Sequence, residues 1–183
     1  MTDLDTILKQ CKKNNKYAQQ TLYNWLAPKL LGVCVRYMKD RDEAEDVMQD
    51  AFVKIFTSLS AFKGTGSFEG WARRIAANTA LSAIRKKGNI YFERDLQVVA
   101  NIEFAEEDER SVSTEMIMAC IDDLPLGYRT IINLYLVEEF SHQEIADKLG
   151  ISPATSRSQY ARARQSLLKA LKLKTEPAGA KNA

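Results

Sequence analysis

The sequence predicts an all-α protein with two small helical domains joined by a flexible linker. Apolar residues recur at helical spacing along most of the chain, and no stretch alternates with the period of a strand. The charge is basic, then acidic, then basic. Residues 1–90 hold 15 Lys/Arg against 9 Asp/Glu, residues 91–125 hold 2 against 10, and residues 126–183 hold 9 against 5. We therefore expect domains over 1–90 and 111–175, an acidic linker over 91–110 and a tail over 176–183.

Helical periodicity divides the first domain into several segments. The first helix begins near Asn14 and is broken or kinked at Pro28, because a proline inside a helix removes a backbone hydrogen bond. A second segment covers about residues 30–38. A third, over 42–59, has the clearest apolar stripe. A loop over 62–67 then leads into a helix that ends near Lys87.

The second domain combines two helices with a helix-turn-helix pattern. The first helix starts near Ser111 and ends at Pro125, and the next carries the apolar residues of 131–136. Ser141 and Glu144 then form a capping box, and Gly150 occupies the position where a left-handed residue stops a helix. Ser152 can cap the following helix, with a proline at its first position.

The last helix carries arginines among small polar residues, including Arg157, Ser158, Gln159, Arg162 and Arg164. Such side chains can reach phosphates and base edges, so the pattern predicts DNA binding. A helical hairpin with a polar surface is the alternative.

Two further features leave alternatives open. Asp46, Gln49 and Asp50 lie at i, i+3 and i+4 and form one patch. From composition alone, a solvated face is favoured over a docking surface. Phe62 and Phe68 flank a glycine-containing loop. They either frame a pocket for an unstacked base or anchor the loop to the core.

The sequence contains no catalytic or metal-binding constellation. It has no phosphate-cradling glycine loop, nucleophile elbow or zinc signature, and the sole histidine, His142, has no local carboxylate or cysteine partner. We expect no enzyme activity, no cofactor and no metal. Three widely spaced cysteines suit a reducing cytoplasm. A polar N-terminus and the lack of a ~20-residue apolar run predict no secretory signal and no membrane insertion.

Taken together, residues 15–172 resemble the extracytoplasmic-function class of bacterial sigma factors. Residues 42–52 (DEAEDVMQDAF) are similar to region 2.2, and residues 68–78 (FEGWARRIAAN) to region 2.3 passing into 2.4. Leu124-Pro125 with the helix after it is similar to region 4.1, and the helix-turn-helix to region 4.2. The absence of a middle domain fits this class.

The resemblance implies promoter-specific initiation, with bacterial core RNA polymerase and promoter DNA as partners and an anti-sigma protein as a further one. It implies that Asp46, Gln49 and Asp50 bind core RNA polymerase. This replaces the interpretation of the patch as a solvated face, which composition alone favours. It also implies two sets of DNA contacts. The −10 set comprises Lys63, Thr65, Ser67, Arg74, Asn78, Arg85, Lys86 and Lys87. The −35 set comprises Thr155, Arg157, Ser158, Gln159 and Arg162.

Three residues differ from what is common in the family: Ser82 replaces an Asp, Gln159 an Arg and His142 an aromatic residue. Base preferences of other members therefore do not transfer directly. Two other functions fit the same patterns. An autonomous regulator would bind DNA tightly without polymerase, and a scaffold for protein partners would show no dependence on DNA.

Overall fold

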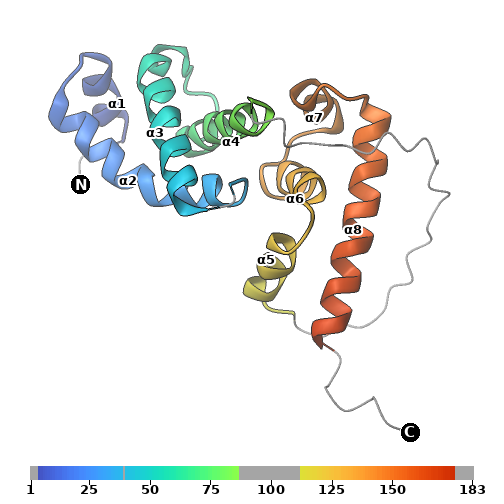
Figure 1. Cartoon of the computed structure of the whole chain (residues 1–183). Helices are drawn as coiled ribbons and strands as arrows, with labels where there is room; N and C mark the ends of the chain where they lie inside the picture. Colours follow the sequence, from blue (N-terminus) through green and yellow to red (C-terminus); the bar gives the residue numbers. More distant parts are fainter. Residues whose placement is uncertain (1–3, 39, 87–111, 176–183) are drawn as a thin grey trace, which may run out of the picture. The chain divides into compact units, whose positions relative to one another are not determined.

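The computed structural model describes residues 4–38, 40–86 and 112–175, and within these ranges the chain forms helices and no strand. The chain divides into two compact units, residues 1–89 and 90–183, which are described separately (Figure 1). The predicted all-α class with two helical units is confirmed. The expected linker (91–110) and tail (176–183) lie outside the described residues.

The first unit is built on three long helices. They are α2 (Lys16–Val35), α3 (Arg41–Thr57) and α4 (Phe68–Lys86), and each packs against the other two. A short helix, α1 (Leu4–Lys12), packs on α2, and a 3-10 turn, η1 (Leu59–Ala61), follows α3. The core between them is apolar and includes Leu26, Leu30, Ala51, Ile55 and Ala76, all at 0% exposure.

The structure corrects two expectations for this unit. α2 continues through Pro28 as one helix of 20 residues instead of breaking there. Pro28 lies on the exposed side, while Leu26 and Leu30 on either side of it are fully buried, so tertiary packing outweighs the lost hydrogen bond. α1 was not predicted. It is a short helix, and it buries only Leu8 and Cys11.

Local interactions fix the start of α3, the helix that carries Asp46, Gln49 and Asp50. The Asp40 side chain accepts a hydrogen bond from the Glu43 backbone N–H at 2.8 Å, so Asp40 is the N-cap. Asp42 and Glu43 lie in the first turn, where negative charge is favourable for the helix dipole. The predicted apolar stripe faces the core through Ala44, Val47, Met48, Ala51, Phe52 and Ile55.

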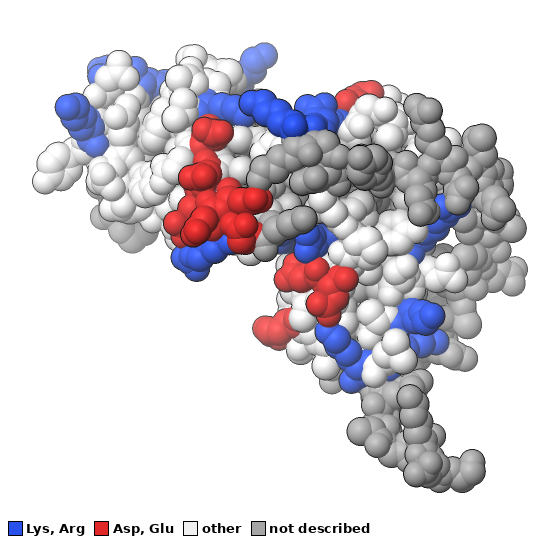
Figure 2. Space-filling model, in the orientation of Figure 1, with Lys and Arg blue, Asp and Glu red and all other residues white. Residues whose placement is uncertain are grey.

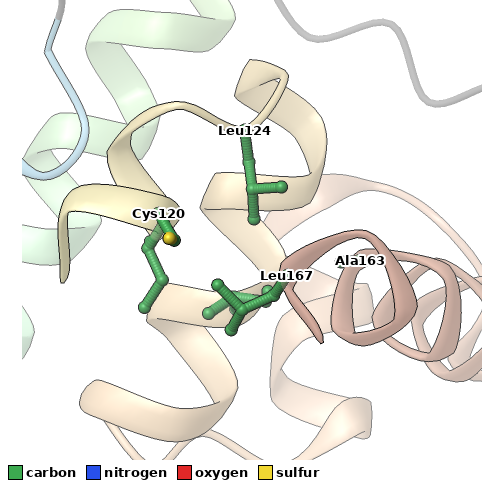
Figure 3. Close-up of a cluster of buried hydrophobic side chains, with 6 residues drawn as sticks. Cys120, Leu124, Ala163 and Leu167 are labelled. Carbon is green, nitrogen blue, oxygen red and sulfur yellow. The ribbon is translucent and has the colours of Figure 1, made fainter. Parts of the chain in front are cut away.

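The second unit is arranged around α8 (Pro153–Thr175). α5 (Thr114–Asp122), α6 (Leu126–Ile132) and α7 (His142–Leu149) all pack on it. A π-helical turn, η2 (Asn133–Val137), continues α6. A buried cluster that includes Cys120, Leu124, Ala163 and Leu167 joins α5 and the α5–α6 turn to the middle of α8 (Figure 3).

Among the described helices, none has both the length and the apolar character required to span a membrane.

Candidate nucleic-acid interface

The acidic patch of the first unit lies on the outer face of α3. Asp46, Gln49 and Asp50 are all exposed, and the Gln49 amide donates a hydrogen bond to the Tyr23 hydroxyl at 3.2 Å. Figure 2 shows Asp and Glu side chains gathered on this unit, with a row of Lys and Arg side chains beside them. The structure therefore brings the three predicted docking residues together on one accessible surface.

An apolar residue in this patch was missed by the sequence analysis. Val53 is 63% exposed and follows Gln49 by four residues and Asp46 by seven, so it shares their face. A partner that covers Val53 would also exclude water from Gln49 and Asp46 on the same face. Helical spacing already separates Val53 from the buried residues of the same helix, because it lies off the apolar stripe.

The loop between η1 and α4 presents three of the predicted −10 residues. Lys63, Thr65 and Ser67 are exposed. Gly64 and Gly66 have φ of 76° and 84°, the left-handed region that favours glycine, and they turn the backbone on either side of Thr65. Ser67 also caps α4, because its hydroxyl accepts a hydrogen bond from the Gly70 backbone N–H at 3.3 Å.

An aromatic cluster holds the two ends of this loop together. The Phe62 ring lies 5.1 Å from Phe68 and 5.6 Å from Trp71, and Phe68 and Trp71 are 5.4 Å apart between centroids. Phe68 is buried, whereas Phe62 and Trp71 are partly exposed. These contacts favour the interpretation in which the aromatic residues anchor the loop and leave its polar tip exposed.

α4 carries the other described −10 candidates. Arg74, Asn78 and Arg85 lie within about 40° of one another around the helix axis, and together they form one face. Lys86 is exposed but lies about a third of a turn from Arg74. Lys87 lies outside the described residues.

The helix-turn-helix of the second unit has the predicted caps. The Ser141 backbone N–H donates to the Glu144 carboxylate at 2.9 Å, and the Ser141 hydroxyl accepts from the Glu144 backbone N–H at 3.3 Å. Gly150 ends α7 with φ 68° and ψ 34°. The Ser152 hydroxyl accepts from the Thr155 backbone N–H at 3.0 Å and caps α8.

The outward face of α8 carries most of the predicted −35 residues. Arg157 is exposed on one flank of this face. Thr155, Ser158 and Arg162, which are spaced i, i+3 and i+7, lie on the other flank and are partly exposed. Between the flanks lie Ala154, Ala161 and Gln165, which were not predicted. Their position follows from which side of α8 is buried.

Gln159 does not belong to this face. It is only 4% exposed and lies on the inner side of α8 with Ser156 and Ala163, which are both at 0%. A direct contact between Gln159 and a base is therefore not supported by this geometry. The packing of α8 on α6 and α7 sets this orientation, and the sequence of α8 alone does not reveal it.

A ring cluster connects α7, η2 and α8 next to the outward face. The His142 ring stacks on Tyr135 with centroids 4.5 Å apart and planes 14° from parallel, and Tyr160 lies 4.5 Å from Tyr135. His142 Nδ1 is 3.0 Å from the Ser156 hydroxyl. Burial lowers the pKa of the His142 imidazole below its ordinary value, and the Arg157 guanidinium lowers it further.

Metal-ligating side chains do not cluster in the part of the chain that the structure describes. No group of three or more His, Cys, Asp or Glu residues there could hold an ion.

Comparison with known proteins assigns both units. Residues 22–90 match Sigma-70 region 2 and residues 114–167 match Sigma-70, region 4. The RNA polymerase sigma-H factor of Pseudomonas aeruginosa is 32% identical over 178 residues, covering 90% of this chain and 92% of the relative. The ECF RNA polymerase sigma factor SigW of Bacillus subtilis is 30% identical, covering 90% of this chain and 95% of the relative.

Two solved structures share the fold. CnrH, solved in complex with the cytosolic domain of CnrY, matches with a TM-score of 0.51 at 21% identity and covers 94% of this chain and all of that chain. The sigma factor RpoE of Bartonella quintana, solved with the anti-sigma factor NepR, matches with a TM-score of 0.52 at 23% identity and covers 84% and 96%. On the sequence matches over both units, the chain belongs to the extracytoplasmic-function class of the sigma-70 family.

Proposed function

We propose that this protein is an alternative sigma factor that binds bacterial core RNA polymerase and directs initiation at promoters with −10 and −35 elements. The observation that carries this proposal is the presence, in one chain, of a region 2 unit followed by a region 4 unit. An isolated helix-turn-helix occurs in many regulators. The pairing with region 2 is what distinguishes a polymerase subunit from an autonomous regulator.

In this proposal the first unit has two tasks. The α3 surface of Asp46, Gln49, Asp50 and Val53 docks on core polymerase. The exposed loop with Lys63, Thr65 and Ser67 receives unstacked bases of the −10 element, while Arg74, Asn78, Arg85, Lys86 and Lys87 contact the nearby strand and backbone. Capture of a flipped base offsets an unpairing cost of a few kcal/mol.

The second unit reads the −35 element as duplex DNA. The outward face of α8 enters the major groove, so that Arg157, Ser158 and Arg162 reach base edges or phosphates and Thr155 contacts the backbone. Ala154 and Ala161 help here because small side chains at the centre of the face let the helix approach the groove closely.

The family assignment also supports proposals about catalysis, localisation and a further partner. RNA synthesis takes place in the core polymerase, so this chain contributes specificity and no catalysis of its own, and it works in the cytoplasm with its polymerase. An anti-sigma protein is a further proposed partner, because a structural neighbour, RpoE of Bartonella quintana, was solved with the anti-sigma factor NepR.

The test is reconstitution with purified components. The protein is mixed with bacterial core polymerase, the complex is isolated by size exclusion, and transcription is run on a library of random promoter DNA. Transcripts that share a two-part upstream motif would support the proposal. Tight DNA binding by the protein alone, without polymerase association, would favour the autonomous regulator.

A further inference from the structure

The start of α8 meets the rest of the second unit through two buried polar side chains and the Tyr160 ring, which lies 4.5 Å from Tyr135. From Pro153 to Arg162 the buried residues are Ser156 and Gln159, and the buried apolar residues of α8, Ala163 and Leu167, come later. The packing of α8 on α6 and α7 determines which side of the helix is buried, but apolar contacts tolerate small rotations better than hydrogen bonds do. A hydrogen bond depends on angle, so a polar attachment at this point constrains rotation.

His142 provides such an attachment from α7. Its Nδ1 lies 3.0 Å from the Ser156 hydroxyl, and Ser156 is fully buried. The imidazole is itself held in place, because it stacks on Tyr135 at 4.5 Å and contacts Tyr160 edge-on at 5.7 Å. The stack on Tyr135 of η2 therefore orients the His142 ring independently of α8.

Ser156, the hydrogen-bond partner of His142, is adjacent in sequence to residues of the outward face of α8. Ser156 directly precedes Arg157 and Ser158, so a rotation of α8 at Ser156 turns both side chains by the same angle. Productive contacts with base edges require donors and acceptors within narrow limits of distance and angle. A small rotation would therefore weaken base readout more than general attraction to phosphates.

We infer that His142 is a positioning residue for −35 recognition: through its hydrogen bond with Ser156, it limits small rotations of the start of α8 and so fixes the direction of Arg157 and Ser158. This inference rests on the proposed function, because it assumes that α8 reads duplex DNA. It assigns a role to the only histidine in the chain, for which the sequence indicates no catalytic function.

Two substitutions remove opposite ends of the hydrogen bond in the full-length protein. His142→Phe keeps an aromatic ring against Tyr135 and loses the nitrogen, while Ser156→Ala loses the hydroxyl. His142→Asn is the rescue variant, because its amide, like Nδ1, carries a polar atom bonded to Cγ. Gln143→Ala, an exposed neighbour on α7, is the matched control.

The measurement is the ratio of transcripts from two templates that share one −10 element, of which one carries the −35 element and the other a scrambled sequence. His142→Phe and Ser156→Ala should each lower this ratio about two- to tenfold, the range that corresponds to one net hydrogen bond. The double variant should be no worse than the more affected single one. His142→Asn and Gln143→Ala should keep the wild-type ratio, and transcription from the −35-independent template should not change.

A wild-type ratio in folded His142→Phe would overturn the inference, as would independent, multiplying effects of the two substitutions. If His142→Phe fails to fold, Ser156→Ala decides the matter alone, and an unchanged ratio there overturns the inference. Failure of the proposed function looks different, because the wild-type protein would then transcribe both templates equally or neither.

Discussion

At the scale of single residues, Arg157 and Gln159 lie two positions apart on α8 in opposite environments. Arg157 is exposed, whereas Gln159 is 4% exposed. Both are polar residues of a recognition helix, and composition does not separate them. Two residues correspond to about 200° of rotation around a helix, so one side chain faces solvent when the other faces the core.

Arg157→Ala is expected to weaken −35-dependent promoter use by about 1–3 kcal/mol, because it removes a charged side chain that we propose reaches the major groove. The measurement is the same transcription ratio between templates with and without the −35 element. Lys169→Ala removes one charge from an exposed position further along α8 and serves as the control. Equal losses in the two variants would mean that only general electrostatic attraction was reduced.

The pKa of His142 should lie below its ordinary value in the free protein. Burial disfavours the charged imidazolium, and Arg157 adds repulsion. NMR titration of the single histidine measures this directly, and Arg157→Ala should raise the pKa. The groups that face the ring are Tyr135, Tyr160 and Arg157, with Arg164 acting on Tyr160. A pKa at or above about 6.5 would contradict the burial argument.

The lowered pKa of His142 makes the folded protein less stable as the pH falls. The unfolded chain binds a proton to His142 at a higher pH than the folded chain does, so the stability from neutral His142 is complete above the unfolded pKa. It is lost as the pH falls from about 6.5 through the lowered folded value. In His142→Asn this part of the pH dependence should be absent.

At the scale of elements, short caps define where helices end, while packing decides whether a helix survives an unfavourable residue. Ser141 with Glu144, Gly150 and Ser152 set the ends of α7 and α8 as the sequence predicts. Pro28 inside α2 shows the opposite case, since the buried leucines around it keep the helix continuous. Local signals are reliable at helix ends, where few tertiary contacts compete with them.

Gly150→Ala is expected to destabilise the second unit by about 1–2 kcal/mol, because it places an L-residue in the left-handed region at φ 68°. Gly150→Asn should cost less, since asparagine tolerates this conformation. Gly32→Ala is the contrasting variant. Gly32 lies inside α2 with open space at its Cβ, so alanine there should stabilise the first unit by about 0.5–1 kcal/mol.

The two tryptophans distinguish these outcomes, because both Trp25 and Trp71 lie in the first unit. Gly32→Ala should raise the urea midpoint followed by tryptophan fluorescence. Gly150→Ala should leave the fluorescence midpoint unchanged. It should lower the urea concentration at which the helices of the second unit unfold, as followed by circular dichroism. A shift of both signals by either substitution would show that the units unfold together.

At the scale of the whole molecule, the two tasks proposed for the first unit fall on surfaces of opposite charge. Figure 2 shows the acidic patch and the basic row of the first unit as separate groups, which suits one surface for a protein partner and another for DNA. The sequence is strongly acidic over residues 91–125, which comprise the expected linker and the start of the second domain. We therefore expect that substitutions can remove either proposed task without affecting the other.

Alanine at Asp46, Gln49 and Asp50 together should abolish co-elution with core polymerase while the helix content stays unchanged. These side chains are exposed, so their removal leaves no cavity in the core. A control with alanine at the exposed Asp5 and Asp122 loses two carboxylates elsewhere and should assemble normally. Normal assembly of the triple variant would remove the docking assignment.

Charge reversal of residues 106–109 from Glu-Glu-Asp-Glu to lysines is expected to weaken initiation without weakening core binding. An acidic segment is repelled by DNA, whereas a basic one would be attracted to it. Glutamine at the acidic positions should give an intermediate effect. Unchanged transcription by the lysine variant in a purified system would contradict this expectation.

The sequence by itself determined the helical class, the division into two units, the caps of the helix-turn-helix and the family resemblance. These depend on the order and spacing of residues, because periodicity and capping act within a few positions along the chain. The tertiary structure decided that α2 passes through Pro28, that Gln159 turns inward and that His142 meets Ser156. Each of these depends on which neighbour covers a helix face, and that neighbour is distant in sequence.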